Sequence, residues 1–398
     1  ISECDWSSER VLFRSKTGSI SLLRGNQSEV KAVYDALSSD NKDENSPLGK
    51  GVDGAQVADS AIIAYRLARL INCPVVATGE EDYVSDGTRV FAVPHGHSIM
   101  TAVTGTGCLL GAVLAAFFGI YDSFKDSLST GEFLAYALAY YGLAGESAVK
   151  VSGIKPGSFS IAFMDALYML DDEVLVSENR VRPIVVPDQL QVYFVCGTQD
   201  TALNKKRLLE IVEDACRGGI TCFQFREKGD GTLEGQQKLE LAQQLQHICA
   251  KYHVLYIIND DVELAVAVNA DGVHVGQDDM CLEDVRNIVG HKVVGISIHS
   301  IEELHKTDVL YADCVGVGPM YTTSSKPDAQ EPCGPERIAE LQAEGLTLPC
   351  VGIGGITIDN AMAVLRAGAC GVAVISAIAH AEKPYEAVRQ FKELASSL

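Results

Sequence analysis

The feature that most constrains the fold is a regular alternation of short apolar segments with helical patterns between Gln191 and the C-terminus. Eight of these segments have the length and the bounding turn residues of strands. They are Val192–Cys196, Thr221–Phe225, Val254–Ile258, Gly272–Val275, Val293–Ile298, Cys314–Gly318, Cys350–Ile353 and Gly371–Ile375. Eight strand and helix units in about 200 residues lie at the lower size limit of a (β/α)8 TIM barrel. We therefore predict that fold, in which active residues sit at the C-terminal ends of the strands.

The second predicted strand ends in the row Gln224-Phe225-Arg226-Glu227-Lys228. Because side chains alternate along a strand, Gln224, Arg226 and Lys228 point to the same side. Two cations and an amide on one face, at the end of an apolar strand, are poorly placed for a core. The row therefore indicates a site for an anion.

The next three predicted strands also end in polar residues. Asn259 and Asp260 end the third strand, Asp279 follows the fourth, and Ser297 ends the fifth. Two carboxylates from neighbouring strand ends suit a hard cation such as Mg²⁺. Each residue has a structural alternative, since Asp260 or Asp279 could cap a helix and Ser297 could be a satisfied strand-end hydroxyl. Taken together, they indicate a site for phosphate and a metal ion.

The last three predicted strands lead into glycine and hydroxyl residues and one lysine. These are Thr323, Ser325 and Lys326 in the loop after the sixth strand, Gly355 after the seventh and Ser376 after the eighth. Glycines and helix N-termini after strands seven and eight form the usual phosphate site of a barrel. A tight turn would also explain the pair Gly354-Gly355.

Composition limits the classes of function. At 398 residues the chain has room for two domains. The net charge of -21 argues against nucleic-acid and anionic-membrane partners, because both need clustered positive charge. The longest apolar run, Cys108–Tyr121, is too short for a bilayer, and we predict a buried helix there. No Cys-x-x-Cys pair occurs among the twelve cysteines, so we expect free, buried thiols and a cytoplasmic location. The chain begins with Ile1, which suggests a fragment.

The first part of the chain contains two local patterns of interest. A short apolar strand, Ile20–Leu23, runs toward Asn26, which can cap a helix whose first turn contains Glu29. A second pattern, Thr104-Gly105-Thr106-Gly107-Cys108, directly precedes the apolar run. Small residues at a helix start let backbone amides converge on an anion, although close packing would explain them equally well.

Taken in order, several of these motifs resemble the C-terminal half of hydroxyethylthiazole kinase, a ribokinase-like enzyme. The motifs are Asn26-x-x-Glu29, Thr78-Gly79, Asp82 to Gly87, Thr104 to Cys108, and Pro156 to Phe159. The resemblance implies that Glu29 helps to organise Mg²⁺ and that Thr78 contacts the phosphates of ATP. It also implies an anion hole that includes Gly105 and Gly107. Cys108 stands where ribokinase-like relatives have an aspartate base.

The predicted barrel looks like thiamine-phosphate synthase over nearly its whole length. The residues that carry this resemblance are Gln224 to Lys228, Ile258 to Asp260, Ala270 to Gln277, Gly318-Pro319, Thr323 to Lys326, Gly352 to Ile356 and Val374 to Ile378. The implied reaction joins hydroxymethylpyrimidine diphosphate to thiazole phosphate and releases diphosphate.

The same resemblance implies a role for each predicted site residue. Gln224, Arg226, Lys228 and Asn259 would hold the pyrimidine diphosphate, and Asp260 and Asp279 would hold Mg²⁺. Ser297 would lie near the diphosphate. Thr323, Ser325 and Lys326 would close over the site, with Lys326 pairing with the diphosphate. Gly355 and Ser376 would offer backbone amides to the thiazole phosphate.

We therefore predict a fused enzyme of thiamine biosynthesis. Residues 1–175 would form a partial ribokinase-like α/β domain, residues 176–190 a linker, and residues 191–398 the barrel. The small-molecule partners would be the pyrimidine diphosphate, thiazole phosphate, hydroxyethylthiazole and ATP, with no nucleic acid or membrane, and we expect a homo-oligomer. The rival hypothesis is a thiazole tautomerase-like barrel with a non-catalytic assembly domain. The cations and carboxylates together argue against it, because a tautomerase has no diphosphate to hold, whereas a first domain without ATP binding would favour it.

Overall fold

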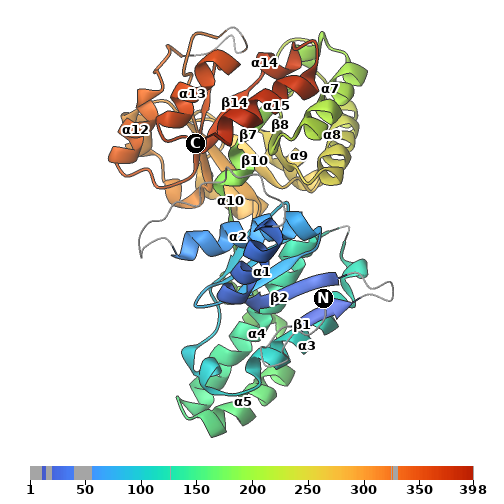
Figure 1. Ribbon diagram of the computed structural model, residues 1–398, viewed down its shortest axis with the longest axis vertical. Coiled ribbons are helices and arrows are strands. Elements are labelled where there is room, and N and C mark those ends of the chain that lie inside the picture. Colours follow the sequence, from blue (N-terminus) through green and yellow to red (C-terminus); the bar gives the residue numbers. More distant parts are fainter. Residues whose placement is uncertain are drawn as a thin grey trace. The chain divides into compact units, whose positions relative to one another are not determined.

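The computed structural model describes residues 11–14, 20–39, 56–125, 127–323, 325 and 330–397. The chain forms two compact units, and the boundary falls between Ile184 and Val185 (Figure 1). The predicted linker, residues 176–190, contains the end of α6 (Asp172–Ser177), strand β6 (Arg182–Ile184) and the 3-10 helix η3 (Pro187–Leu190).

The first unit is built on a six-stranded sheet whose strands follow one another in chain order. They are β1 (Val11–Arg14), β2 (Ile20–Asn26), β3 (Val75–Thr78), β4 (Asp82–Ser85), β5 (Val90–Val93) and β6. The pair β2–β3 is parallel and the other pairs are antiparallel. The predicted hairpin with its turn at Asp86-Gly87 is β4–β5. Strand β1 was not predicted, because its sequence has no clear period.

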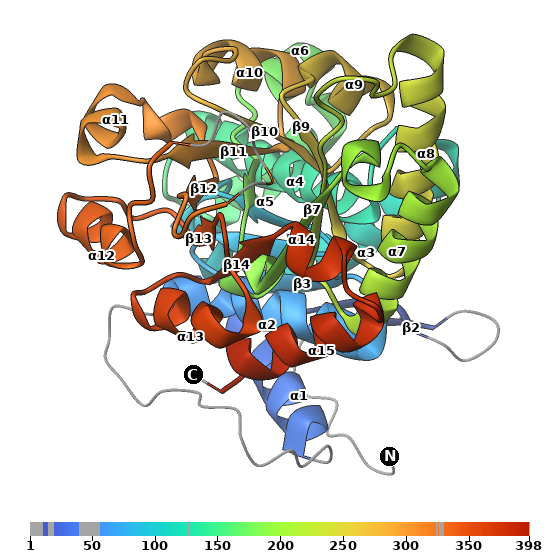
Figure 2. The same cartoon turned by 90° about the horizontal axis from the view of Figure 1, so that it is seen from above.

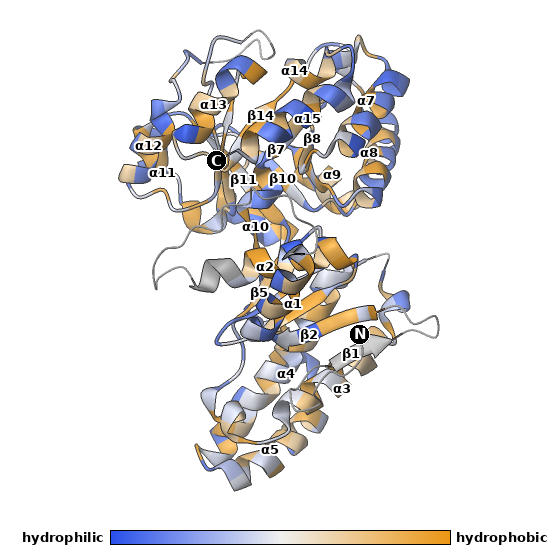
Figure 3. Ribbon diagram, in the orientation of Figure 1, coloured by the Kyte–Doolittle hydropathy of each residue, from blue (hydrophilic) through white to orange (hydrophobic). Residues whose placement is uncertain are grey.

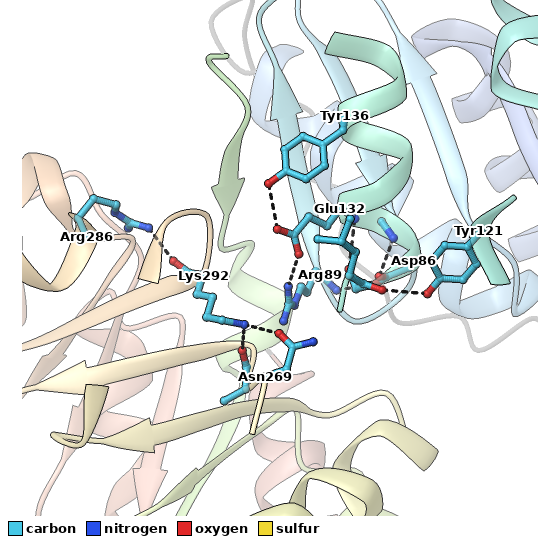
Figure 4. A network of polar contacts seen from close by, with 12 residues as sticks. Asp86, Arg89, Tyr121, Glu132, Tyr136, Asn269, Arg286 and Lys292 are labelled. Carbon is cyan, nitrogen blue, oxygen red and sulfur yellow. Dashed lines mark hydrogen bonds and ion pairs between the residues drawn. The ribbon is translucent and has the colours of Figure 1, made fainter. Parts of the chain in front are cut away.

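Helices cover both faces of this sheet. They are α1 (Gln27–Ser39), α2 (Gln56–Ile71), α3 (Thr106–Phe118), α4 (Thr130–Ser152), α5 (Pro156–Met169) and α6. Figure 1 shows α1 and α2 on one face and α3 to α5 on the other. On the α4 face, a buried Arg89 guanidinium pairs with Glu132 at 3.0 Å, and Glu132 accepts from Tyr136 at 3.1 Å (Figure 4). This charge network is satisfied internally, as a buried arginine requires.

The apolar helix α3 differs from its prediction. Within this fully described helix, Leu110, Gly111 and Leu114 are the buried residues, and its other side chains are partly or fully exposed. The prediction of a buried helix was wrong for most of its length, because apolar composition does not reveal how many neighbouring elements cover a helix. In the part of the chain that the structure describes, Thr106–Ser123 is the one helical stretch long and apolar enough to cross a membrane, and 17% of it is buried. Helix α3 itself ends at Phe118.

The second unit is a closed barrel of eight parallel strands. They are β7 (Val192–Cys196), β8 (Cys222–Phe225), β9 (Leu255–Asn259), β10 (Gly272–Val275), β11 (Val293–Ile298), β12 (Cys314–Val317), β13 (Cys350–Ile353) and β14 (Gly371–Val374). Strand β14 pairs with β7 and closes the ring. The predicted (β/α)8 fold is confirmed, and no predicted strand bound differs from the observed one by more than one residue.

A ring of helices surrounds the barrel strands (Figure 2). These helices are α7 (Lys205–Gly218), α8 (Gly235–Lys251), α9 (Val262–Ala267), α10 (Leu282–Val289), α11 (Ile301–Lys306), α12 (Glu336–Ala343), α13 (Ile358–Arg366), α14 (Ser376–Ala379) and α15 (Pro384–Ala395). Figure 3 shows apolar strands inside and polar outer surfaces on α7 and α8.

Strand alternation divides the barrel core into two layers. On β7, Val192 and Phe194 face the helices, whereas Tyr193 and Val195 belong to the interior cluster. The same alternation on β8 turns Phe223 outward and Cys222 inward, so Gln224 follows Cys222 to the inside. The inward side chains of these strands are largely apolar, and the inward Gln224 lines a cavity at the C-terminal ends of the strands.

The N-terminal end of the barrel strands is tied by a different set of polar contacts. Lys292, just before β11, donates to Asn269 Oδ1 at 2.6 Å and to Ala270 O at 2.7 Å (Figure 4). Arg286 donates to Lys292 O at 2.6 Å and pairs with Asp313 at 2.6 Å. In barrels this end serves stability, while the C-terminal end of the strands serves chemistry.

Candidate active site

A cavity of about 350 Å³ lies at the C-terminal ends of the barrel strands. Eleven of the twelve barrel residues predicted for substrate or metal binding line it. They are Gln224, Arg226, Lys228, Asn259, Asp260, Asp279, Ser297, Thr323, Ser325, Gly355 and Ser376. The twelfth, Lys326, lies outside the described residues. Barrel closure thus brings side chains from seven strand ends to one place.

The row on β8 is held by two contacts to the C-terminal end of the neighbouring strand β9. Gln224 donates to Asn259 Oδ1 at 2.7 Å, and Lys228 pairs with Asp260 at 2.8 Å. The hydrogen bond with Asp260 raises the pKa of Lys228, so this amine keeps its charge. Arg226 is 6% exposed. A buried guanidinium needs a negative charge nearby, and Arg226 interacts electrostatically with the Asp200 carboxylate.

The outward residue of the same row anchors it. The Glu227 carboxylate accepts from Thr198 N at 2.9 Å, from Thr198 Oγ1 at 2.5 Å and from Leu233 N at 2.8 Å. Gly197 fits against the strand so closely that a Cβ there would lie 1.9 Å from Arg226 O. Because side chains alternate, Arg226 and Lys228 point inward and Glu227 points outward. Glu227 can therefore bind the loop after β7. The sequence analysis did not predict a role for Glu227, although a carboxylate between two inward cations could have indicated one.

Asp260 and Asp279 form a carboxylate pair. Asp260 has φ of 60° and donates its backbone N–H to His274 O at 2.9 Å. Asp279 accepts from Gly276 N at 2.8 Å. Burial and the neighbouring Asp279 carboxyl raise the pKa of Asp260, although the Lys228 ammonium opposes this. Two carboxyl groups this close favour a proton or a cation between them.

Ser297, His274 and the loop that contains Gly354 and Gly355 complete the wall of the cavity. Ser297 Oγ lies 3.0 Å from His274 Nε2. His274 also lines the cavity and was missing from the predicted site, although a polar residue at an inward strand position was a signal for it. Gly354 and Gly355 have φ of 96° and 63°, and a Cβ on Gly355 would lie 2.6 Å from Thr322 O. Only glycine fits there.

In the first unit, the predicted residues lie near the ends of β2 and β3. Asn26 Oδ1 accepts from Glu29 N, and Glu29 Oε2 accepts from Asn26 N, both at 2.9 Å. This reciprocal cap confirms the predicted helix start. The Thr78 hydroxyl donates to Gly25 O at 3.3 Å.

The other predicted residues of this unit lie at the start of α3. Gly105 has φ of 99°, and the position of its missing Cβ faces open space. Gly107 and the exposed Cys108 follow in the first turn of the helix. Tyr141 Oη donates to Thr106 O at 2.5 Å and is within electrostatic range of both Cys108 and Arg24.

The sequence analysis did not predict a role for Arg24. It is 7% exposed on β2, and its Nη2 donates to Thr78 Oγ1 at 3.4 Å. Burial raises the pKa of the nearby Asp82 to about 7, although the Gly79 N–H and the charge of Arg24 oppose the shift. The charge of Arg24 within the otherwise apolar strand before Asn26 could have indicated this residue. Hydrogen bonds and electrostatic interactions therefore connect five residues of this unit: Arg24, Thr78, Asp82, Tyr141 and Cys108.

A parallel barrel that gathers cations, carboxylates and glycines at its open end has the construction of an enzyme for phosphorylated substrates. Two family models match this chain: "Thiamine monophosphate synthase" at residues 192–378 and "Hydroxyethylthiazole kinase family" at residues 8–173. Thiamine-phosphate synthase of Staphylococcus carnosus is 48% identical over 202 residues, which cover 51% of this chain and 95% of that protein. That of Geobacillus thermodenitrificans is 49% identical over 205 residues, covering 52% and 91%. The chain belongs to the thiamine-phosphate synthase family.

Two solved structures are also similar to parts of this chain. Thiamine phosphate pyrophosphorylase from Pyrococcus furiosus is 30% identical, with a TM-score of 0.47, over 53% of this chain and 98% of that one. A hydroxyethylthiazole kinase from Pyrococcus horikoshii is 29% identical, with a TM-score of 0.34, over 42% of this chain and 56% of that one. The chain thus spans about half the length of that kinase.

The predicted class of function is confirmed. This chain is a transferase of thiamine biosynthesis with a thiamine-phosphate synthase domain, and its residues 8–173 match the hydroxyethylthiazole kinase family model. The rival hypothesis of a tautomerase-like barrel with an assembly domain is not favoured, because the curated relatives of the barrel are synthases.

Proposed function

We propose that the barrel joins hydroxymethylpyrimidine diphosphate to thiazole phosphate and releases diphosphate. The observation that carries this proposal is the gathering of eleven predicted residues from separate strand ends into one cavity. In the reaction, the bond between the pyrimidine methylene carbon and the diphosphate oxygen breaks. A new bond forms between that carbon and the thiazole nitrogen. The pyrimidine amino group can delocalise the positive charge that develops in between.

Gln224, Arg226, Lys228 and Asn259 would hold the pyrimidine diphosphate. The contact between Gln224 and Asn259 fixes both amides, and the Gln199 side chain donates to Arg226 O, which holds the backbone that carries the buried guanidinium. Cations held in place before the reaction stabilise the charge that grows on the leaving diphosphate. Thr323, Ser325 and Lys326 would close over the site, with Lys326 paired with the diphosphate.

Asp260 and Asp279 would hold Mg²⁺. Among the described residues, no group of three or more His, Cys, Asp or Glu side chains could hold a metal. Two carboxylates are nevertheless what Mg²⁺ takes when substrate phosphates complete its shell, so the residues present fit this ion. When bound there, a divalent cation neutralises charge on the departing diphosphate. Gly355 and Ser376 would offer backbone amides to the thiazole phosphate.

We further propose that the first unit phosphorylates hydroxyethylthiazole with ATP. Glu29 would help to organise Mg²⁺, Thr78 would contact ATP phosphates, and Gly105 and Gly107 would shape an anion hole beside Cys108. The closeness of Arg24 to Thr78 adds a cation to this group. The thiazole phosphate made there is the substrate that the barrel consumes.

A product assay with two substrate sets tests both proposals. The chain is incubated with Mg²⁺ and pyrimidine diphosphate, and with either thiazole phosphate or hydroxyethylthiazole plus ATP. Thiamine phosphate from thiazole phosphate supports the synthase, and its absence contradicts it. Product from the alcohol and ATP supports the kinase, whereas product from thiazole phosphate alone contradicts kinase activity of this chain.

The cellular location and the oligomeric state of the chain are also proposals. Each of the eleven cysteines that the structure describes is free, which suits a reducing compartment. We keep the cytoplasm as the proposed location and a homo-oligomer as the proposed state. Size-exclusion chromatography with light scattering tests the latter.

A further inference from the structure

His274 lies on the inner face of β10, where it is 8% exposed and lines the cavity. Parallel pairing places Gly295 of β11 beside it. A Cβ on Gly295 would lie 2.3 Å from His274 Nδ1, and one on Gly316 of β12 would lie 3.2 Å from its Cε1. Two glycines thus make room for one placement of the imidazole, and the backbone of the next two strands sets its orientation.

In this placement His274 joins two parts of the candidate site. Its Nε2 reaches Ser297 Oγ at 3.0 Å. Its backbone carbonyl accepts from Asp260 N at 2.9 Å. His274 therefore connects Ser297 of β11 with Asp260, one carboxylate of the pair.

The direction of the bond to Ser297 decides what the serine can do. A hydroxyl has one proton to donate and lone pairs with which to accept. If His274 accepted that proton, Ser297 would have none left for an anion. If His274 Nε2–H donates, the proton of Ser297 stays available to an anionic oxygen. The second arrangement suits a cavity whose wall includes Arg226 and Lys228, because these charges select an anion.

We propose that His274 is a positioning residue, which donates from Nε2 to Ser297 Oγ and so directs the serine proton toward the leaving diphosphate. This inference rests on the proposed synthase function. Because charge on the diphosphate grows in the transition state, the loss of His274 should lower kcat and leave KM for the pyrimidine diphosphate nearly unchanged. The effect should also need the Ser297 hydroxyl.

A double-mutant cycle tests the inference on the full chain. The variants are Ser297→Ala, His274→Met and both together, with His274→Gln as the conservative variant. Methionine fills space without an N–H, and glutamine keeps one. We expect S297A and H274M each to lower kcat by about 10- to 100-fold, the range for a hydrogen bond to a charged group. In the S297A background, H274M should add less than about twofold. H274Q should recover most of the loss.

Other outcomes overturn the inference. An equal loss from H274M in both backgrounds would mean that His274 acts directly or only through folding. Unchanged kcat in H274M would remove its role, while S297A would still report on the proposed serine. No product from the unsubstituted chain would overturn both this inference and the synthase proposal. If circular dichroism shows H274M unfolded, His274→Asn, whose shorter amide falls short of Ser297, takes its place in the cycle with the same expectations.

Discussion

The two units of this chain present their predicted site residues differently. In the barrel, side chains from seven strand ends line one cavity of about 350 Å³. In the first unit, Cys108 is exposed, and Gly105 faces open space on the side of its missing Cβ. The apolar groove of that unit is lined by residues of α4, α5 and α6 and not by the predicted site residues. A barrel closes a site from its own strands, whereas a site on an open sheet needs further elements to enclose it.

Coverage of known proteins follows the same division. The chain covers 95% of a curated synthase, and the kinase family model matches residues 8–173. We expect changes in the barrel site to alter synthase turnover strongly. Changes in the first unit should alter only the ATP-dependent route or stability.

The largest effect is expected from Asp260→Asn. Loss of one carboxylate of the pair should weaken cation binding and lower synthase turnover by about 100- to 1000-fold. Turnover measured over a range of Mg²⁺ concentrations checks this result. Asp261→Asn is the matched control, because Asp261 caps α9 at 3.0 Å from Leu264 N and does not line the cavity. Asparagine caps equally well, so the control should stay within about twofold. Equal losses in both variants would contradict the assignment.

The second-largest effect is expected from a substitution of Gly197, which packs against Arg226 of the β8 row. Gly197→Ala would place a Cβ 1.9 Å from Arg226 O, so backbone must move. We expect a loss of about 2–3 kcal/mol in the free energy of unfolding, together with lower synthase turnover. Urea unfolding followed by circular dichroism measures the first quantity. In the other unit, Gly157→Ala meets nothing within 4 Å and should change stability by less than about 1 kcal/mol. A tolerated alanine at 197 would show that the loop after β7 does not constrain Arg226.

The third prediction separates the two activities. Cys108→Ala should lower thiamine phosphate formation from hydroxyethylthiazole and ATP by about 10- to 100-fold, because it removes a group from the proposed phosphoryl-transfer site. Formation from thiazole phosphate should not change. Cys281→Ala, which removes the other exposed thiol of the described chain, serves as the control and should leave the ATP-dependent rate as it is. A parallel loss in both routes would mean that Cys108 supports the whole protein instead.

The smallest effect is a pH dependence of stability in the first unit. The pKa of Asp82 rises from 3.8 to about 7 on folding, chiefly through burial. The folded state therefore binds this proton more tightly, and stability falls as pH rises between about 4 and 7. The full shift corresponds to at most about 4 kcal/mol, and partial exposure lowers our expectation to about 1–2 kcal/mol.

Asp82→Asn should flatten this dependence, because asparagine can still accept from Gly79 N without titrating. Urea unfolding at pH 4.5, 6 and 8 provides the measurement. Asp122→Asn, at a side chain 94% exposed, should leave the profile unchanged. A steeper decline in D82N than in the unsubstituted chain would show that the sign of the Asp82 contribution is wrong.

The strands of the barrel were predictable because their signals are local. A run such as Val192–Cys196 has the length and residue types of a buried strand, and its bounds were found without any knowledge of the partners. Fixed alternation along a strand also predicted that Gln224, Arg226 and Lys228 share a side. The cap between Asn26 and Glu29 depends on three residues of spacing and was equally visible.

Other features depend on segments that are distant in the chain. The exposure of α3 follows from which helices cover it, and its apolar composition pointed the other way. Arg24 meets Thr78 across 54 residues, and His274 meets Ser297 across 23. These contacts exist because β2 pairs in parallel with β3, and β10 with β11.

The sequence by itself determined the eight strand and helix units, the face on which the cations lie and the family to which the chain belongs. The tertiary structure alone decided which side chains meet. It gave Ser297 its histidine, placed Glu227 on the loop after β7 and left Cys108 exposed. The physical reason is that alternation and capping act over a few residues. Distances between strand ends depend on register and on closure of the ring between β14 and β7.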